Sequence, residues 1–101
     1  MKENIVYMLR CRNDNFYTGW TNDFIKRMGS HQKGNGAHYT RAFVPESVVY
    51  VEVFETKSEA MKKEALIKKM TRTQKEEMIQ QYEERTQDYL NNHPFEFKKD
   101  F

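Results

Sequence analysis

The fold is decided by two short stretches near the start of the chain, Asn4-Ile5-Val6-Tyr7-Met8-Leu9 and Asn15-Phe16-Tyr17-Thr18-Gly19-Trp20. Both are rich in β-branched and aromatic side chains, which favour strands. The polar residues Arg12-Asn13-Asp14 between them are typical of a turn, so the sequence predicts a β-hairpin. Tyr7 and Tyr17 lie on neighbouring strands of this hairpin, and we expect their phenol groups to lie side by side.

A helix is predicted directly after the hairpin. Thr21-Asn22-Asp23 supplies side chains suited to an N-terminal cap, and we expect the helix over about residues 22 to 32. Arg27 and His31 are four residues apart in it, so both project from one side of the helix. Together with the more distant carboxylate of Glu64, these groups and the two phenols suggest a site that acts on a phosphodiester.

The strongest strand signal in the chain is Val48-Val49-Tyr50-Val51-Glu52-Val53-Phe54, which is almost continuously apolar or β-branched. It predicts a well-buried third strand over about residues 47 to 55. Thr56-Lys57-Ser58-Glu59 is a capping box, which predicts a helix from residue 57 to about residue 70. The expected fold class is α+β, with a small, three-stranded, largely antiparallel sheet flanked by helices.

The last quarter of the chain is predicted to be helical with a short tail. Thr71-Arg72-Thr73 offers a cap for a charged helix over about residues 72 to 89. The alternating aromatic residues from Phe95 to Phe101 could pack on the body or form a loose terminus. We expect a single domain over residues 1–101, with residues 80–101 as a C-terminal helix and tail extension.

Glu64 stands out because it falls on the predicted apolar side of its helix. That side is expected to consist of Ala60, Met61, Ile67 and Met70. Burying a carboxylate costs free energy unless a cation or strong donors lie near it. Glu64 is therefore either paired with Arg27 or a lysine, or it is a metal ligand.

The net charge of +2 conceals an uneven distribution. Residues 24–75 hold eleven Lys and Arg against five acids, and residues 76–101 hold three against seven. This pattern suits a polyanion bound by the middle of the chain, and a solvated, lysine-rich helix face is the alternative. The single cysteine, Cys11, excludes an internal disulfide, and no signal peptide or membrane span is visible, so a cytoplasmic location is expected.

The two tyrosine motifs resemble those of the GIY-YIG nucleases. Ile5-Val6-Tyr7 stands at the family's first motif, although its glycine is absent, and Tyr17-Thr18-Gly19 stands at the second. Arg27 matches the family's helix arginine, and His31 falls where a histidine or tyrosine often follows. Glu64 matches the metal-binding glutamate.

The resemblance covers roughly residues 4 to 79 and is broad for a motif-based assignment. The segment Gly36-Ala37-His38-Tyr39-Thr40-Arg41 is similar to the small, stand-alone, single-domain bacterial branch of the family. One departure is the asparagine that many members carry after the metal-binding helix. The corresponding region here reads Thr71-Arg72-Thr73-Gln74-Lys75.

The resemblance implies a catalytic set of Tyr7, Tyr17, Arg27, His31 and Glu64, with one Mg²⁺ or Mn²⁺ held by Glu64. Arg27 would brace the phosphate, and Tyr17 would hydrogen-bond the attacking water or the phosphate. Tyr7 would orient or deprotonate the water. Because an ordinary phenol is a poor base, this role needs a lowered pKa or a proton passed onward, for which His31 is the candidate relay.

The expected partner is nucleic acid, with DNA favoured, and no membrane and no small-molecule cofactor are expected. Its candidate contacts are Lys26, Lys33, His38, Tyr39, Arg41 and Lys68. A wider electropositive face is predicted from Lys26, Lys33, Arg41, Lys62, Lys63 and Lys69.

The function predicted from these features is a metal-dependent endonuclease that hydrolyses phosphodiester bonds in DNA, monomeric in isolation. One alternative is a GIY-YIG-like nucleic-acid-binding module with little or no cleavage. The other is a protein-interaction domain that uses the C-terminal helix.

Overall fold

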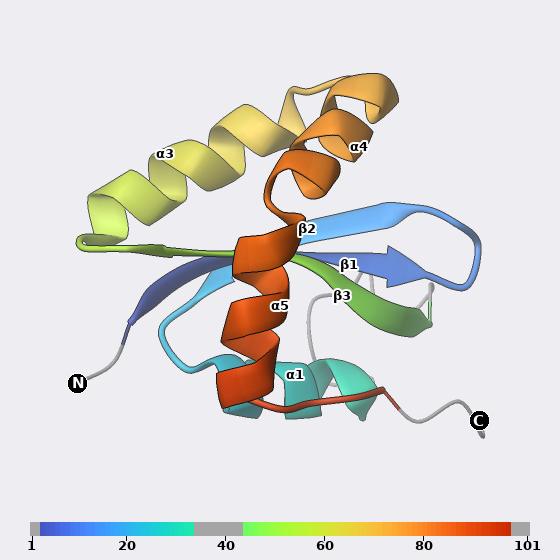
Figure 1. Cartoon of the computed structure of the whole chain (residues 1–101), viewed down its shortest axis with the longest axis vertical. Helices are drawn as coiled ribbons and strands as arrows, with labels where there is room; N and C mark the ends of the chain where they lie inside the picture. Colours follow the sequence, from blue (N-terminus) through green and yellow to red (C-terminus); the bar gives the residue numbers. More distant parts are fainter. Residues whose placement is uncertain (1–2, 34–43, 98–101) are drawn as a thin grey trace.

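The computed structural model describes residues 3–33 and 44–97 of the chain. The sheet has three strands in the order β2-β1-β3, and both pairings are antiparallel. Helices flank it on both faces, which confirms the predicted α+β class (Figure 1). The elements in chain order are β1 (Asn4–Cys11), β2 (Phe16–Thr21), α1 (Phe24–Gln32), β3 (Pro45–Phe54), α3 (Lys57–Lys68), α4 (Arg72–Gln81) and α5 (Glu83–Asn92).

The predicted hairpin is formed by β1 and β2. The Cys11 N–H donates to the Asn15 carbonyl at 2.9 Å, and the Asp14 N–H donates to the Cys11 carbonyl at 2.8 Å. Asp14 has a φ of 66°, the left-handed conformation that Asp tolerates better than most side chains. Tyr7 lies opposite Gly19 in the resulting register, and this pairing positions the site described below.

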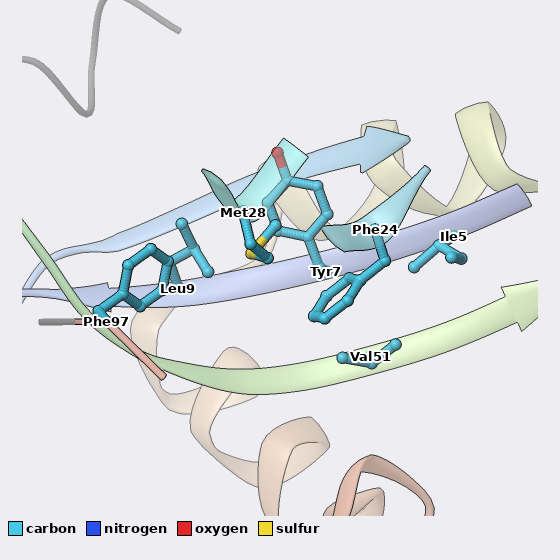
Figure 2. Close-up of a cluster of buried hydrophobic side chains, with 7 residues drawn as sticks. All are labelled: Ile5, Tyr7, Leu9, Phe24, Met28, Val51 and Phe97. Carbon is cyan, nitrogen blue, oxygen red and sulfur yellow. The ribbon is translucent and has the colours of Figure 1, made fainter. Parts of the chain in front are cut away.

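The side chains of β1 alternate between two buried clusters, one on each face of the sheet. The α1 face carries the cluster drawn in Figure 2, which contains Ile5, Tyr7, Leu9, Phe24, Met28, Val51 and Phe97. The α3–α4 face carries Val6, Met8, Tyr50, Ala60, Ile67 and Met78. Both faces of β1 are therefore covered, and residues 5 to 9 are all buried.

β1, not β3, is the most deeply buried strand of this sheet. The prediction that the apolar run in β3 is well buried was wrong, because only Pro45, Tyr50 and Val51 of that strand are buried and Val53 is 43% exposed. The physical reason is position. β3 lies at an edge, whereas β1 lies in the centre with helices on both faces.

The helix predicted over residues 72 to 89 is two helices, α4 and α5, which meet at Tyr82. Met78 of α4 packs on the α3–α4 face, whereas Tyr89 and Leu90 of α5 pack on the α1 face. The chain must pass around the β3 edge between these contacts, so one straight helix cannot make both (Figure 1). α5 is fixed there by a hydrogen bond from the Val51 N–H to the Thr86 hydroxyl at 3.2 Å.

The predicted helix caps are present. Asp23 caps α1, and capping boxes at Thr56–Glu59 and Thr71–Gln74 open α3 and α4. The tail packs on the body as far as it is described, with Phe97 buried in the cluster of Figure 2. None of the helices in residues 3–33 and 44–97 has the length and apolar content needed to span a membrane.

Candidate active site

Tyr7 reaches from the central strand toward the β2 edge because its cross-strand partner is a glycine. A Cβ on Gly19 would lie 2.7 Å from the Tyr7 hydroxyl oxygen and 2.9 Å from its ring carbon Cζ. Real Cβ atoms do not approach that closely, so only glycine allows this tyrosine conformation. Figure 2 shows the hydroxyl oxygen beside the β2 ribbon. Sequence reasoning placed Gly19 in a motif but did not identify this steric role.

The Tyr7 hydroxyl has two polar partners on α1. It lies 2.7 Å from His31 Nε2, and Arg27 Nε donates to it at 3.3 Å. Because a guanidinium can only donate, the phenol oxygen accepts from Arg27 and its own hydrogen is free to donate to His31. This assignment requires the His31 tautomer with its hydrogen on Nδ1. The site therefore contains a directed path for a proton from Tyr7 to His31.

The protonation states at neutral pH follow from burial. Burial raises the pKa of the Tyr7 phenol, and the hydrogen bond from Arg27 only partly opposes this rise. Burial also lowers the pKa of His31 to about 4, with the Arg27 charge acting in the same direction. Tyr7 is thus a phenol and His31 a neutral acceptor. Of the two conditions for a role of Tyr7 in deprotonation, the lowered Tyr7 pKa is absent, because burial raises it. The second condition is met, because His31 can accept the proton that Tyr7 passes on.

Tyr17 completes the aromatic side of the site. Its ring centroid lies 6.3 Å from that of Tyr7 and 5.2 Å from that of His31. Hydrogen bonding to Tyr7, and more weakly to Tyr17, raises the pKa of Arg27. Arg27 therefore remains a fixed cation that contacts both phenols.

Glu64 approaches from α3, which packs against the opposite face of the sheet from α1. Its negative charge is the smallest contribution to the raised pKa of Tyr7. It pairs with Lys68 at 3.5 Å, with the Glu64 side chain 19% exposed and that of Lys68 58% exposed. The predicted inward position of Met61 was wrong, because Met61 is 46% exposed at the margin of the buried Ala60 and Ile67.

The donor set around Glu64 fits one hydrated divalent cation. No cluster of three or more His, Cys, Asp or Glu side chains that could hold a metal occurs in residues 3–33 and 44–97. Mg²⁺ commonly keeps several water ligands and uses one or two carboxylates plus substrate phosphate oxygens. A single, partly open carboxylate such as Glu64 meets that requirement, whereas a dehydrated ion would need further protein ligands.

The described lysines among the residues predicted to contact nucleic acid or to form an electropositive face have different surroundings. Lys26 is exposed on α1, Lys33 is exposed at the C-terminal cap of α1, and Lys68 pairs with Glu64. Lys63 instead pairs with Glu52 on β3 at 4.0 Å. Lys62 and Lys69 are exposed, and helical geometry directs them away from Glu64. The remaining predicted contacts lie outside the described residues, namely His38, Tyr39 and Arg41.

The segment after α3, where the resemblance led us to look for an asparagine, is the first turn of α4. The Gln74 side chain accepts from the Thr71 N–H at 2.9 Å and so closes the capping box. Lys75, one residue later, lines a depression beside Tyr17. This segment therefore brings a cation, not an amide, to the margin of the site.

Comparison with known proteins identifies the family. A sequence model described as the GIY-YIG catalytic domain matches residues 3–77. The UPF0213 protein CPE1444 of Clostridium perfringens is 50% identical over 76 residues, which cover 75% of this chain and 82% of that protein. A UPF0213 protein of Streptococcus pneumoniae serotype 4 is 42% identical over 80 residues, which cover 79% and 81%.

Two solution NMR structures share the fold. The protein EF2693 of E. faecalis is 38% identical with a TM-score of 0.60, and the match covers 82% of this chain and 88% of that one. The UPF0213 protein BH0048 of Bacillus halodurans is 37% identical with a TM-score of 0.53, and the match covers 77% and 83%. The family match spans both tyrosine motifs, Arg27, His31 and Glu64. The chain therefore belongs to the GIY-YIG family of nucleases and is similar to its small UPF0213 members.

Proposed function

We propose that this protein is a divalent-metal-dependent endonuclease that hydrolyses phosphodiester bonds in DNA. The observation that carries the proposal is the Tyr7 hydroxyl, which is held between the Arg27 cation and the neutral His31 imidazole. Glu64 lies on α3, on the other face of the sheet, and its charge contributes to the raised pKa of this phenol. A phenol between a proton acceptor and a cation can help to deprotonate a water molecule that attacks a phosphate. A nearby carboxylate can bind the metal ion that this reaction uses.

In this mechanism Tyr7 positions the attacking water and moves its proton. The water donates to the Tyr7 oxygen while the Tyr7 hydroxyl donates to His31 Nε2, across the observed 2.7 Å contact. The hydroxide oxygen then bonds to phosphorus as the bond to the leaving oxygen breaks, and the leaving oxygen keeps that electron pair and takes a proton from solvent water. His31 holds the proton as an imidazolium, which the negative charge of the bound phosphate helps to stabilise.

Arg27 and Lys68 would stabilise the negative charge of the substrate phosphate. Arg27 already contacts both phenols, and its remaining N–H groups can donate to a non-bridging phosphate oxygen. Lys68 is exposed and pairs with Glu64 in the free protein, so it can turn to a phosphate on binding. A Mg²⁺ or Mn²⁺ ion held by Glu64 would supply further stabilisation of the charge that develops in the transition state.

The direct test is cleavage of labelled single-stranded, duplex and branched DNA by purified protein, with and without Mn²⁺. We expect metal-dependent cleavage that falls by at least about a hundredfold in Glu64→Gln, the scale of losing one transition-state stabilising group. Glu77→Gln is the matched control, because Glu77 is an exposed carboxylate on α4. Equal cleavage by wild type and Glu64→Gln would contradict the proposal.

The second candidate is a nucleic-acid-binding module without cleavage. The observation that favours it is the region from Thr71 to Lys75, which lacks the asparagine found in many members of the family. The same assay separates the two functions. Wild-type protein that binds DNA at low salt but leaves every substrate intact with Mn²⁺ present would support the binding module.

A further inference from the structure

A depression of about 300 Å³ adjoins the proposed active site at the outer edge of β2. It is lined by Phe16, Tyr17 and Thr18 of the strand, by Lys68 at the end of α3, and by Lys75 in α4. Tyr17 belongs to both places, because its ring also lies 5.2 Å from that of His31. The depression is thus continuous with the site and has two cations on its rim.

Arg72 holds Phe16, a wall residue of the depression, in place through contacts with the hairpin turn and α4. Its guanidinium lies over the Phe16 ring at 4.0 Å and pairs with Asp14 at 3.3 Å and with Glu76 at 3.4 Å. These contacts join the hairpin turn to α4. Lys75, in contrast, forms no ion pair in the part of the chain that the structure describes. Its charge therefore remains available to a ligand.

We propose that Lys75, with Lys68, binds the phosphate adjacent to the one that is cleaved, where one strand of nucleic acid crosses the edge of β2. This inference rests on the proposed function, because the position of the cleaved phosphate comes from the Tyr7 and Glu64 site. Lys68 pairs with Glu64, and Lys68 and Lys75 both line the depression, whose described lining residues include no carboxylate. A chain of phosphates is the ligand that matches a row of cations beginning at a phosphodiester site.

The size and chemistry of the depression favour a single strand. Its volume is at the lower end of the range for small-ligand sites, too small for a double helix. The ring of Tyr17 offers an apolar surface to a sugar or base, which is typical of sites that follow one strand without reading its sequence. The expected recognition is therefore of the phosphate and not of a particular base.

Binding of a single-stranded oligonucleotide tests the proposal without cleavage. All variants carry Glu64→Gln to prevent turnover, and affinity is measured over a range of salt concentrations. We expect Lys75→Gln to weaken binding several-fold and to reduce the slope of log K against log salt by about 0.7, the value for one phosphate contact on a single strand. Lys75→Arg should keep the slope, and Lys62→Gln, an exposed lysine on the far side of α3, should leave affinity and slope unchanged.

A neutral methylphosphonate linkage locates the contact. Placed on one side of the cleaved position, it should weaken binding of the Glu64→Gln protein, and by less when Lys75→Gln is also present, because only Lys68 then remains at that phosphate. If the two losses are additive at every position, or if Lys75→Gln behaves as Lys62→Gln, the assignment of Lys75 is overturned and the proposed nuclease function is not. If the Glu64→Gln protein does not bind the oligonucleotide even at low salt, the assignment of Lys75 fails, and the cleavage assay on all three kinds of DNA decides the nuclease function separately.

Discussion

Two buried tyrosines on neighbouring strands, Tyr7 in β1 and Tyr50 in β3, lie on opposite faces of the sheet and have opposite surroundings. Both are fully buried, and burial is the main cause of the raised pKa of each phenol. The Tyr50 hydroxyl donates to the Glu52 carboxylate, which pairs with Lys63. The Tyr7 hydroxyl instead accepts from a guanidinium and faces a neutral imidazole.

The difference shows that burial alone does not mark a catalytic tyrosine. Glu52 opposes the loss of the Tyr50 proton, because its hydrogen bond and charge both raise the pKa further. Arg27 favours a negative charge on Tyr7, and His31 can receive the proton. Tyr7 also reaches Gly19 of β2, whereas Tyr50 packs against Tyr82 at a centroid distance of 5.5 Å. Tyr7 thus suits proton transfer, and Tyr50 suits a fixed role in the core.

The largest expected difference between the two tyrosines is in cleavage rate. Tyr7→Phe removes the hydroxyl that positions the water, and we expect kcat to fall by about 10²- to 10⁴-fold. Tyr50→Phe should leave kcat unchanged and lower the free energy of unfolding by about 1 to 2 kcal/mol, because Glu52 loses a donor. Cleavage assays and urea unfolding of both variants measure this. Equal losses of kcat in the two variants would break the comparison.

The next largest effect concerns the space that Tyr7 occupies. Gly19→Ala would place a methyl group 2.7 Å from the Tyr7 oxygen and 3.2 Å from Tyr17 Cε1, so both phenols must move. We expect about a hundredfold loss of kcat, since small displacements of positioned groups have effects of that size. Gly29→Ala is the matched control, because a methyl group there meets no atom within 4 Å.

The control variant Gly29→Ala has its own expected effect on the free energy of unfolding. Gly29 lies inside α1, where alanine is favoured over glycine by up to about 1 kcal/mol, so Gly29→Ala should be neutral or stabilising. Its cleavage rate should match that of wild type. A Gly19→Ala protein with a wild-type rate would show that the position of the Tyr7 hydroxyl is not critical.

A pH effect on stability should sharpen the contrast further. The pKa of His31 is about 4 in the folded protein and about 6.5 in the unfolded chain. Between these values only the unfolded chain binds the proton, so His31 makes the free energy of unfolding fall as pH falls from about 6.5 to 4, by up to about 3 kcal/mol. In the His31→Gln variant, the free energy of unfolding should fall less between pH 6.5 and pH 4 than in wild type. Urea unfolding at these two pH values measures the difference. An unchanged pH dependence would mean that His31 is not held neutral beside Tyr7.

The smallest expected effect lies at the β3 edge. Thr86→Val removes the acceptor of the buried Val51 N–H, and we expect a loss of about 1 to 2 kcal/mol in the free energy of unfolding. Cleavage should be unaffected because α5 covers the edge opposite the site. Thr73→Val, at an exposed position on α4, is the control and should change neither quantity. A loss of cleavage without a loss of stability in Thr86→Val would bring the β3 edge into the function.

The features that could be predicted from sequence depend on residues near one another in the chain. The turn at Arg12 to Asp14, the cap at Asp23 and the capping box at Thr56 are local in this sense. The helical spacing of Arg27 and His31 and the pairing of two adjacent strands bring those side chains to the phenols. Local patterns therefore accounted for most of the fold and for the grouping of four candidate site residues.

The features that sequence reasoning missed depend on contacts between distant residues. The apolar run in β3 does not reveal that β1 takes the centre of the sheet, because that depends on how the strands assemble. The pairing of Lys63 with Glu52, and the position of Lys75 beside Tyr17, likewise require the packing of α3 and α4 on the sheet. The break at Tyr82 follows from the passage of the chain around the β3 edge.

We propose that Glu64 binds a divalent metal ion near the β2 edge. The most direct test of this proposal is titration of isotope-labelled protein with Mn²⁺, which broadens the NMR signals of nuclei near the bound ion. We expect the earliest broadening at Glu64, in β2 and around Tyr7, and its loss in Glu64→Gln but not in Glu77→Gln. Broadening that begins elsewhere, for example at Glu83 and Glu84 on α5, or that survives unchanged in Glu64→Gln, would contradict the account.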